Sequence, residues 1–183
     1  MGVDMQHSHA QQQKNDTLDF HSFPSHEACA EALAEYVAER LQQAQAARGR
    51  SSLVVSGGGT PVPMFQQLKD APLDWSKQVI TLADERWVSP ADDESNEKLV
   101  RDHLLAPGAQ FVPLKHEAPT LEEGARKAAQ ALAKAIPDAF DVVILGMGGD
   151  GHTASLFPHH PALPEALRTD NDTCCMAVEN APK

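Results

Sequence analysis

Cysteine is scarce in this sequence, and the few cysteines present follow no framework. Only three occur among the 183 residues, Cys29, Cys174 and Cys175, and two of them are adjacent. A secreted disulfide scaffold needs an even set of spaced cysteines, so that class is excluded and a reducing compartment is favoured. A chain of this length can bury a core without disulfides or metal.

Long apolar runs are also missing. No stretch approaches the roughly 20 residues of a membrane-spanning helix, and the N-terminus lacks the basic-then-apolar pattern of a signal peptide. We therefore expect a cytoplasmic protein that does not insert into membranes.

Basic residues are in the minority. Lys and Arg number 15 against 26 Asp and Glu, which gives a formal net charge of −11. The overall field repels nucleic acid and anionic membranes, so neither is expected as a partner. An anionic small molecule must then be held by a local device. The sequence leaves open whether the chain is a monomer or a weak homo-oligomer.

The chain alternates between apolar runs and helical periods. Residues 1–16 are polar and aperiodic, which is typical of a disordered leader. The remainder predicts one domain, with strands at 17–23, 53–55, 78–83, 111–114, 142–145 and 173–178, and helices at 27–46, from 64 onward, 95–105 and 121–136. Such alternation indicates an α/β fold with a mostly parallel sheet.

The apolar run at 142–145 opens into a loop with glycines at 146, 148, 149 and 151. The run predicts a strand buried on both faces, and the loop then lies at its carboxyl end, where open α/β sheets bind ligands. Asp150 and His152 lie in this loop, and an imidazole is suited to proton transfer near neutral pH. The pattern predicts a catalytic histidine. The alternative is a turn required by topology alone, with a surface histidine.

A second glycine-rich turn, Ser-Gly-Gly-Gly-Thr-Pro at 56–61, follows the run at 53–55 and precedes a helical period. A strand, glycines and a helix start point free N–H groups and the helix dipole at an anion, which predicts phosphate binding by Gly58, Gly59 and Thr60. Neither the Walker pattern nor the dinucleotide fingerprint is matched, so a nucleotide is not indicated. The alternative is a turn without ligand, in which Thr60 caps the helix and Pro61 takes its first position.

Three charged residues, Asp84, Glu85 and Arg86, follow the run at 78–83. Charges at the end of a buried strand are costly unless they are paired or bind something. Arg86 offers a planar fork for phosphate or carboxylate, and Asp84 can orient it or bond a sugar hydroxyl. The alternative is a structural ion pair between Asp84 and Arg86.

Taken together, these motifs resemble the 6-phosphogluconolactonases: the turn at 56–61, the segment 84–88 with Ser95-Asn96 after it, and Gly-Met-Gly-Gly-Asp-Gly-His-Thr-Ala-Ser-Leu-Phe-Pro at 146–158. The resemblance extends from about Thr17 to Lys183. It implies a doubly wound, Rossmann-like three-layer fold with helices on both faces of the sheet, shared with the glucosamine-6-phosphate isomerase/deaminases. Deaminases of that group carry a Glu five residues after the loop histidine and a Tyr at position 86. Phe157 and Arg86 stand there instead, which favours the lactonases.

The resemblance implies hydrolysis of 6-phospho-D-glucono-1,5-lactone to 6-phospho-D-gluconate in the oxidative pentose phosphate pathway, without metal or organic cofactor. His152 would be the base that activates water, and Arg86 and the loop N–H groups would supply positive potential. Asp84 would orient Arg86 or the lactone, while Asp150 either belongs to the site or holds the loop. The residues implied for the phosphate are Gly58, Gly59, Thr60 and Arg86.

Lactonases of this family usually continue past the Asn-Ala-Pro-Lys segment with a further strand, a helix and a lysine suited to the phosphate. We therefore expect residues 17–183 to be a single lactonase domain that lacks those elements and binds phosphate weakly. The rival hypotheses are a phosphosugar isomerase or deaminase, and a non-catalytic sugar-phosphate-binding domain such as the effector module of a regulator. The regulator predicts a basic helix-turn-helix pattern, which residues 1–183 do not contain.

Overall fold

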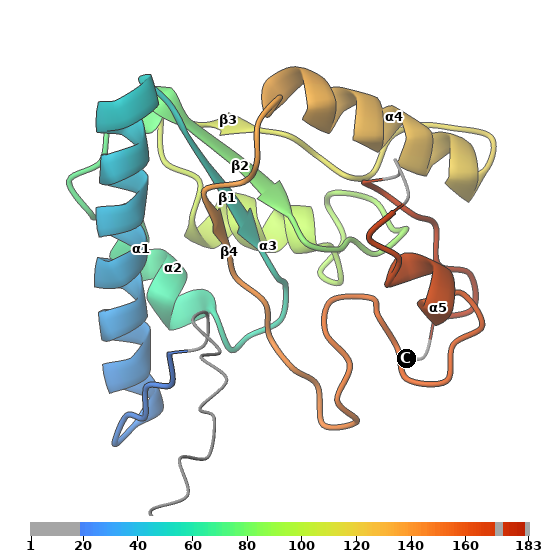
Figure 1. Ribbon diagram of the computed structural model, residues 1–183, viewed down its shortest axis with the longest axis horizontal. Coiled ribbons are helices and arrows are strands. Elements are labelled where there is room, and N and C mark those ends of the chain that lie inside the picture. Colours follow the sequence, from blue (N-terminus) through green and yellow to red (C-terminus); the bar gives the residue numbers. More distant parts are fainter. Residues whose placement is uncertain (1–18, 171–173, 182–183) are drawn as a thin grey trace, which may run out of the picture.

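The computed structural model describes residues 19–170 and 174–181. Within these residues, four parallel strands form one sheet in the order β3-β2-β1-β4 (Figure 1). The strands are β1 (Ser51–Val55), β2 (Gln78–Leu82), β3 (Gln110–Phe111) and β4 (Val142–Val143). The helices are α1 (His26–Arg48), α2 (Val62–Lys69), α3 (Asn96–His103), α4 (Leu121–Ala135) and α5 (Leu163–Ala166), with a short 3-10 turn at Trp75–Lys77.

The centre of the sheet is formed by β1 and β2, which are buried along their whole length. Leu53 of β1 pairs with Ile80 of β2 on one side and with Val142 of β4 on the other. A strand that is covered on both faces requires an unbroken apolar run, and Leu53 to Val55 supplies it. The strands predicted at 53–55 and 78–83 are therefore confirmed.

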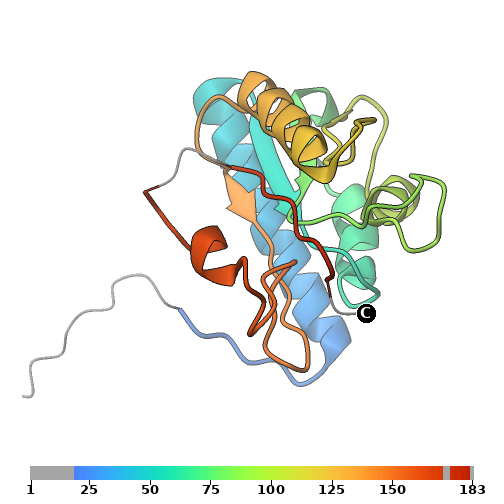
Figure 2. The ribbon, with the colours of Figure 1, turned by 90° about the vertical axis from the view of Figure 1, so that its right-hand side faces the viewer.

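Helices cover both faces of this sheet, as predicted. On one face α1, α2 and α3 bury Leu41, Phe65 and Val100 against the strands. On the other face Leu132 of α4 packs against Val79 and Val112 (Figure 2). The result is the three-layer α/β arrangement.

The first helix begins and ends at favourable capping residues. The Oγ of Ser25 accepts a hydrogen bond from the N–H of Ala28 at 3.2 Å, and Gly49 ends the helix in the left-handed conformation with φ of 75°. These caps satisfy backbone groups that the helix itself cannot pair. The helix predicted at 27–46 is confirmed and extends slightly further at both ends.

The direction of winding reverses between β1 and β4. The chain steps outward from β1 to β2 and β3, and then crosses back through α4 to place β4 on the other side of β1. In open α/β sheets the crevice outside the carboxyl ends of the strands at such a reversal is the usual binding place. The glycine turn after β1 and the histidine loop after β4 lie on either side of it.

The prediction for 142–145 as a strand buried on both faces is wrong. Only Val142 and Val143 are in strand conformation, and Val142 and Ile144 pack against the core. Val143 and Leu145 are 48% and 54% exposed. Among the described residues β4 lies at the edge of the sheet, and α4 packs over β2 and β3 instead, so one face of β4 stays uncovered.

Three other strand predictions need correction. Of the strand predicted at 17–23, residues 19–23 are exposed and form no strand. Positions 17 and 18 and the leader predicted at 1–16 lie outside the described residues. Of the strand predicted at 173–178, position 173 lies outside the described residues and 174–178 form no strand; residues 174–177 border a groove against α4. The strand predicted at 111–114 is limited to Gln110–Phe111.

None of the helices in residues 19–170 and 174–181 combines the length and apolar content needed to cross a membrane.

Candidate active site

His152 and Asp150 form a hydrogen-bonded pair in the loop after β4. The Nδ1 of His152 lies 2.5 Å from Oδ1 of Asp150, and the same oxygen accepts the backbone N–H of His152 at 3.1 Å. The ring lies over Gly148, because a Cβ built there would fall 2.2 Å from the Cε1 of His152. Gly151, with φ of 86°, closes the turn by donating to the carbonyl of Gly148. The glycines therefore permit the turn and leave room for the imidazole.

The charge of Asp150 is stabilised by its neighbour. The hydrogen bond from the backbone N–H of His152, and then the bond from its ring, lower the pKa of the Asp150 carboxyl below its usual value. An ionised carboxylate can only accept, so Nδ1 carries a proton, and in the neutral imidazole Nε2 is then the nitrogen with the lone pair. The side chain of His152 is 35% exposed, which leaves it within reach of solvent. The same carboxylate also holds the loop, because it accepts the backbone N–H of His152; its part in a catalytic site stays a prediction.

Phe157 packs against the histidine ring. The ring centroids of His152 and Phe157 lie 5.0 Å apart with a tilt of 43°. An apolar ring there fixes the imidazole by contact and brings no second titratable group to it. This is the position at which the deaminases were expected to carry a Glu.

The glycine turn after β1 has a distinct requirement at each glycine. Gly57 lies against Asn96, since a Cβ at Gly57 would fall 1.8 Å from the side-chain oxygen of Asn96. Gly58 has φ of 85°, a conformation that favours glycine. Gly59 is exposed with open space around it. Two of the three glycines are thus needed by the fold, and the third leaves backbone open to a ligand.

The helix after this turn lacks a side-chain cap. α2 begins at Val62, and the residue at its N-cap is Pro61, which makes no capping hydrogen bond. The alternative in which Thr60 caps the helix is therefore wrong. The carbonyl of Thr60 instead contacts Nε2 of His26, from the start of α1, at 3.0 Å. The first turn of α2 nevertheless offers few N–H groups to an anion. Val62 already donates to the carbonyl of Gly59 at 3.2 Å, and Pro61 and Pro63 have no N–H.

Asp84 and Arg86 do not pair with each other. The carboxylate of Asp84 accepts from the amide of Asn96 at 3.2 Å and from the hydroxyl of Ser155 at 2.7 Å. Arg86 is exposed, and within residues 19–170 and 174–181 its guanidinium has no ion-pair or hydrogen-bond partner. The structural ion pair considered from the sequence is thus absent there, and the guanidinium is free to meet a ligand.

The three loops are tied together at the carboxyl edge of the sheet. Ser56 donates to the carbonyl of Ile144 at 3.2 Å, which joins the loops after β1 and β4. Ser155 joins the loop after β4 to Asp84, and Asn96 joins Asp84 to Gly57. His152, Asp84 and the glycine turn therefore belong to one connected site.

Asn96 and Ser155 were not predicted as site residues. Both lie inside the motifs that carry the family resemblance. Their hydrogen-bond partners, however, depend on how α3 and the loop after β4 pack beside β2. The turn that delivers Ser155 includes Ala154 at φ of 51°, an unusual conformation for a residue with a side chain. Nothing in the sequence pattern marks it.

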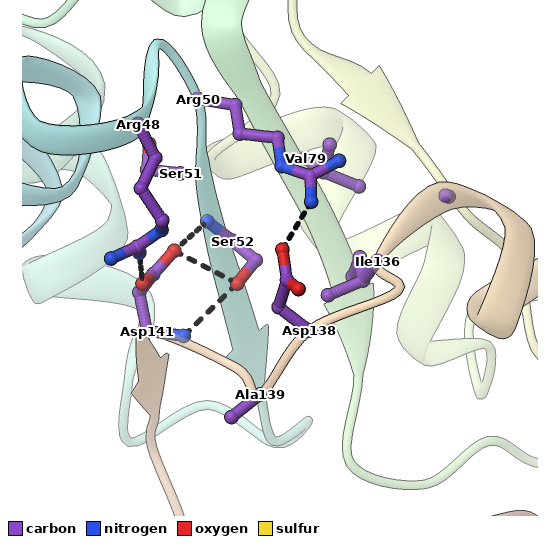
Figure 3. A pocket seen from close by; sticks show the side chains of 10 residues that line it. Arg48, Arg50, Ser51, Ser52, Val79, Ile136, Asp138, Ala139 and Asp141 are labelled. Atoms are coloured by element: carbon purple, nitrogen blue, oxygen red, sulfur yellow. Dashed lines mark hydrogen bonds and ion pairs between the residues drawn. The ribbon is translucent and has the colours of Figure 1, made fainter.

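A small hollow at the opposite, amino-terminal edge of the sheet serves the fold (Figure 3). Asp141 accepts there from Arg48 and from the N–H and hydroxyl of Ser52, and Asp138 pairs with Arg50. These groups satisfy each other, so this edge carries the joints between α1, β1 and β4.

The carboxyl edge thus has the features of an α/β enzyme site: a histidine held by a carboxylate, a guanidinium without a partner among the described residues, and an exposed glycine turn. The sequence model of the glucosamine-6-phosphate isomerases/6-phosphogluconolactonase family matches residues 24–183. A 6-phosphogluconolactonase of Rhizobium meliloti (strain 1021) is 51% identical over 170 residues, which are 90% of this chain and 73% of the relative. One of Pseudomonas putida is 45% identical over 86% of this chain and 66% of the relative.

A solved structure agrees. The crystal structure of a 6-phosphogluconolactonase from Shewanella baltica OS155 superposes with a TM-score of 0.77 at 51% identity, over 81% of this chain and 64% of that one. The chain belongs to the glucosamine-6-phosphate isomerase/6-phosphogluconolactonase family, and the resemblance predicted from its motifs is confirmed. It spans about two thirds of the length of these relatives.

Proposed function

We propose that this chain hydrolyses 6-phospho-D-glucono-1,5-lactone to 6-phospho-D-gluconate. The observation that carries the proposal is the Asp150–His152 pair after β4. Asp150 holds Nδ1 of the ring, and Nε2 has no hydrogen-bond partner among the described residues. The proposal is supported by the lactonases to which the chain is similar.

In the proposed reaction the Nε2 of His152 takes a proton from a water molecule as the water oxygen attacks the lactone carbonyl. Asp150 keeps the ring in the required tautomer and stabilises the imidazolium that forms, as an orienting carboxylate does in hydrolytic sites. The carbonyl π bond opens to an oxyanion, which Arg86 and loop N–H groups stabilise. When the carbonyl re-forms, the ring C–O bond breaks and the leaving oxygen takes the proton from His152.

The remote phosphate orients the ring for this attack. Its proposed contacts are the exposed backbone of Gly58 and Gly59, and Thr60, together with Arg86. Binding energy from a group remote from the reacting bond can hold the carbonyl in position, which converts affinity into rate. Asp84, held by Asn96 and Ser155, is available to a sugar hydroxyl through its remaining acceptor capacity. No step requires a metal or organic cofactor.

The proposal is tested by following lactone disappearance above its spontaneous hydrolysis, with 6-phosphogluconate identified as product. His152→Ala should lower turnover by about 100- to 10,000-fold, because it removes a general base. Its melting temperature should stay close to that of the wild type, since the side chain is partly exposed. Near-native turnover in His152→Ala would assign water activation to another group.

A parallel assay for ammonia release from glucosamine 6-phosphate separates the lactonase from a deaminase. Phe157 offers no carboxylate beside His152, so we expect no ammonia. Tight binding of 6-phosphogluconate without turnover of either substrate would instead favour a sugar-phosphate-binding domain.

A further inference from the structure

Within the part of the chain that the structure describes, the side chain of Arg86 makes no hydrogen bond or ion pair that would hold it in one position. The guanidinium is exposed and has no partner within residues 19–170 and 174–181. A free arginine loses rotamer entropy when it grips a ligand, and this opposes binding. Whatever preorganises Arg86 must therefore act on its backbone, through the residues on either side.

Glu85 ties this backbone to the start of α3. Its Oε1 accepts the N–H of Arg86 at 2.7 Å and that of Asn96 at 2.8 Å, while Oε2 accepts the N–H of Glu97 at 2.8 Å and the hydroxyl of Ser95 at 3.2 Å. A carboxylate at a helix N-terminus satisfies free N–H groups and is favoured by the helix dipole. Glu85 thus caps a helix that lies more than ten residues further along the chain.

Trp87 ties the same backbone to α4, which covers the other face of the sheet. A Cβ built on Gly124 would fall 2.1 Å from Cη2 and 2.9 Å from Cζ2 of Trp87. The indole edge therefore fills the space that a side chain at position 124 would need. Glycine inside a helix costs about 1 kcal/mol relative to alanine, and the close approach of Trp87 accounts for its presence in α4.

We infer that Glu85 and Trp87 are positioning residues for Arg86, held by α3 and by Gly124 of α4 respectively. We call these three residues, Glu85, Trp87 and Gly124, the Arg86 clamp. It fixes the backbone of Arg86 from both faces of the sheet, so that the side chain always extends from the same point of the carboxyl edge and only its own rotamers remain to be ordered. The inference rests on the proposed function in that Arg86 is taken to contact the substrate.

The first test is Gly124→Ala. Alanine improves the helix propensity of α4, but its Cβ displaces the indole of Trp87. We expect kcat/KM for the lactone to fall by about 10- to 100-fold, because small misplacements of a catalytic group have effects of that size. The melting temperature should not fall in parallel. Gly124→Ala combined with Trp87→Phe should regain part of the loss, since the smaller ring leaves room for the methyl group.

The second test compares Glu85→Gln with Glu94→Gln. Both remove one negative charge near the start of α3, but Glu94 is exposed and its carboxylate has no hydrogen bond or ion pair within residues 19–170 and 174–181. Glu85→Gln should lower kcat/KM by at least about 10-fold, and Glu94→Gln should match the wild type. Wild-type kcat/KM in both Gly124→Ala and Glu85→Gln would overturn the clamp and leave the lactonase proposal standing.

A third measurement reports on the clamp without turnover. The sequence has two tryptophans, so Trp75→Phe leaves Trp87 as the sole emitter. In that background Glu85→Gln and Gly124→Ala should both shift the emission of Trp87, while Glu94→Gln should not. A wild-type chain without lactonase activity would refute the proposed function, and unchanged emission in both clamp variants would refute the clamp.

Discussion

In the proposed reaction Nδ1 of His152 binds Asp150 and Nε2 accepts the proton of water. Asp150 decides this assignment, because its carboxylate contacts Nδ1. The pKa of the Asp150 carboxyl lies below its ordinary value of 3.8, first because of the backbone N–H of His152 and then because of its ring. A lowered folded-state pKa means that Asp150 contributes stability at pH values above its ordinary pKa. This contribution is lost as the pH falls through the lowered value.

This sign gives a measurable expectation. The carboxyl carbon of Asp150, followed by NMR, should titrate below 3.8 in the wild type. His152→Ala removes the ring but keeps the backbone N–H, so the midpoint should rise only part of the way back. A full return to the ordinary value would show that the backbone bond contributes little, and no change would show that the ring bond does not matter.

Arg86 differs from His152 in having no partner to hold it within the described part of the chain. Arg86→Lys should lower kcat/KM by about 10- to 100-fold, because a planar fork is replaced by a point charge and a charge-assisted hydrogen bond contributes roughly 1.5 to 3 kcal/mol. Its melting temperature should hardly change, since no structural contact of the guanidinium is lost. A large thermal loss with intact kinetics would indicate a structural role instead.

At the scale of elements, the turn after β1 packs closely against the start of α3, where Gly57 contacts Asn96. Gly57→Ala should force Asn96 away, because the new Cβ would fall 1.8 Å from its side-chain oxygen. Overpacking of this kind costs about 1 to 3 kcal/mol, or roughly 2 to 10 °C in melting temperature for a chain of this size. Activity should fall with it, because Asn96 also holds Asp84.

Gly59→Ala is the matched control. Its Cβ would meet nothing within 4 Å, so stability should be unchanged, while the methyl group blocks the approach of the phosphate and raises KM. If Gly59→Ala left KM unchanged, phosphate would have to bind elsewhere. Equal thermal losses in the two variants would contradict the distinction drawn between these glycines.

The sequence predicted elements where a local pattern was sufficient. Leu53 to Val55 are apolar without interruption, and the run at 78–83 is apolar except for Gln78 and Thr81; these two runs form the two central strands. The run at 142–145 has the same pattern, yet Val143 is half exposed. A local pattern cannot predict whether a strand lies at the centre or at the edge of a sheet. The glycines around Asp150 and His152 were enough to mark these two residues as candidates. The partners of Glu85 could not, because they depend on how α3 docks beside β2.

For the molecule as a whole, the two edges of the sheet have separate roles. The carboxyl edge holds the candidate site, and the amino-terminal edge holds the ion pairs around Asp141 and Asp138 (Figure 3). The side chain of Asp141 is only 14% exposed, and it joins the end of α1, through Arg48, to the starts of β1 and β4. The side chain of Asp138 is 62% exposed, and within residues 19–170 and 174–181 its one ion pair is with Arg50.

Asp141→Ala should therefore destabilise the whole chain, while Asp138→Ala should not. Removing a mostly buried carboxylate leaves Arg48 and Ser52 without their acceptor, and breaking a buried pair costs about 3 to 5 kcal/mol. Because Arg48 is itself 46% exposed to solvent, we expect a smaller loss of roughly 2 kcal/mol, or about 4 to 8 °C. Asp138→Ala removes the same charge from the same loop, and an exposed pair contributes only about 0 to 1 kcal/mol. Measured well below their melting temperatures, both variants should hydrolyse the lactone at the wild-type rate. A loss of turnover in folded Asp141→Ala would show that the edge which holds the strands together also positions the site.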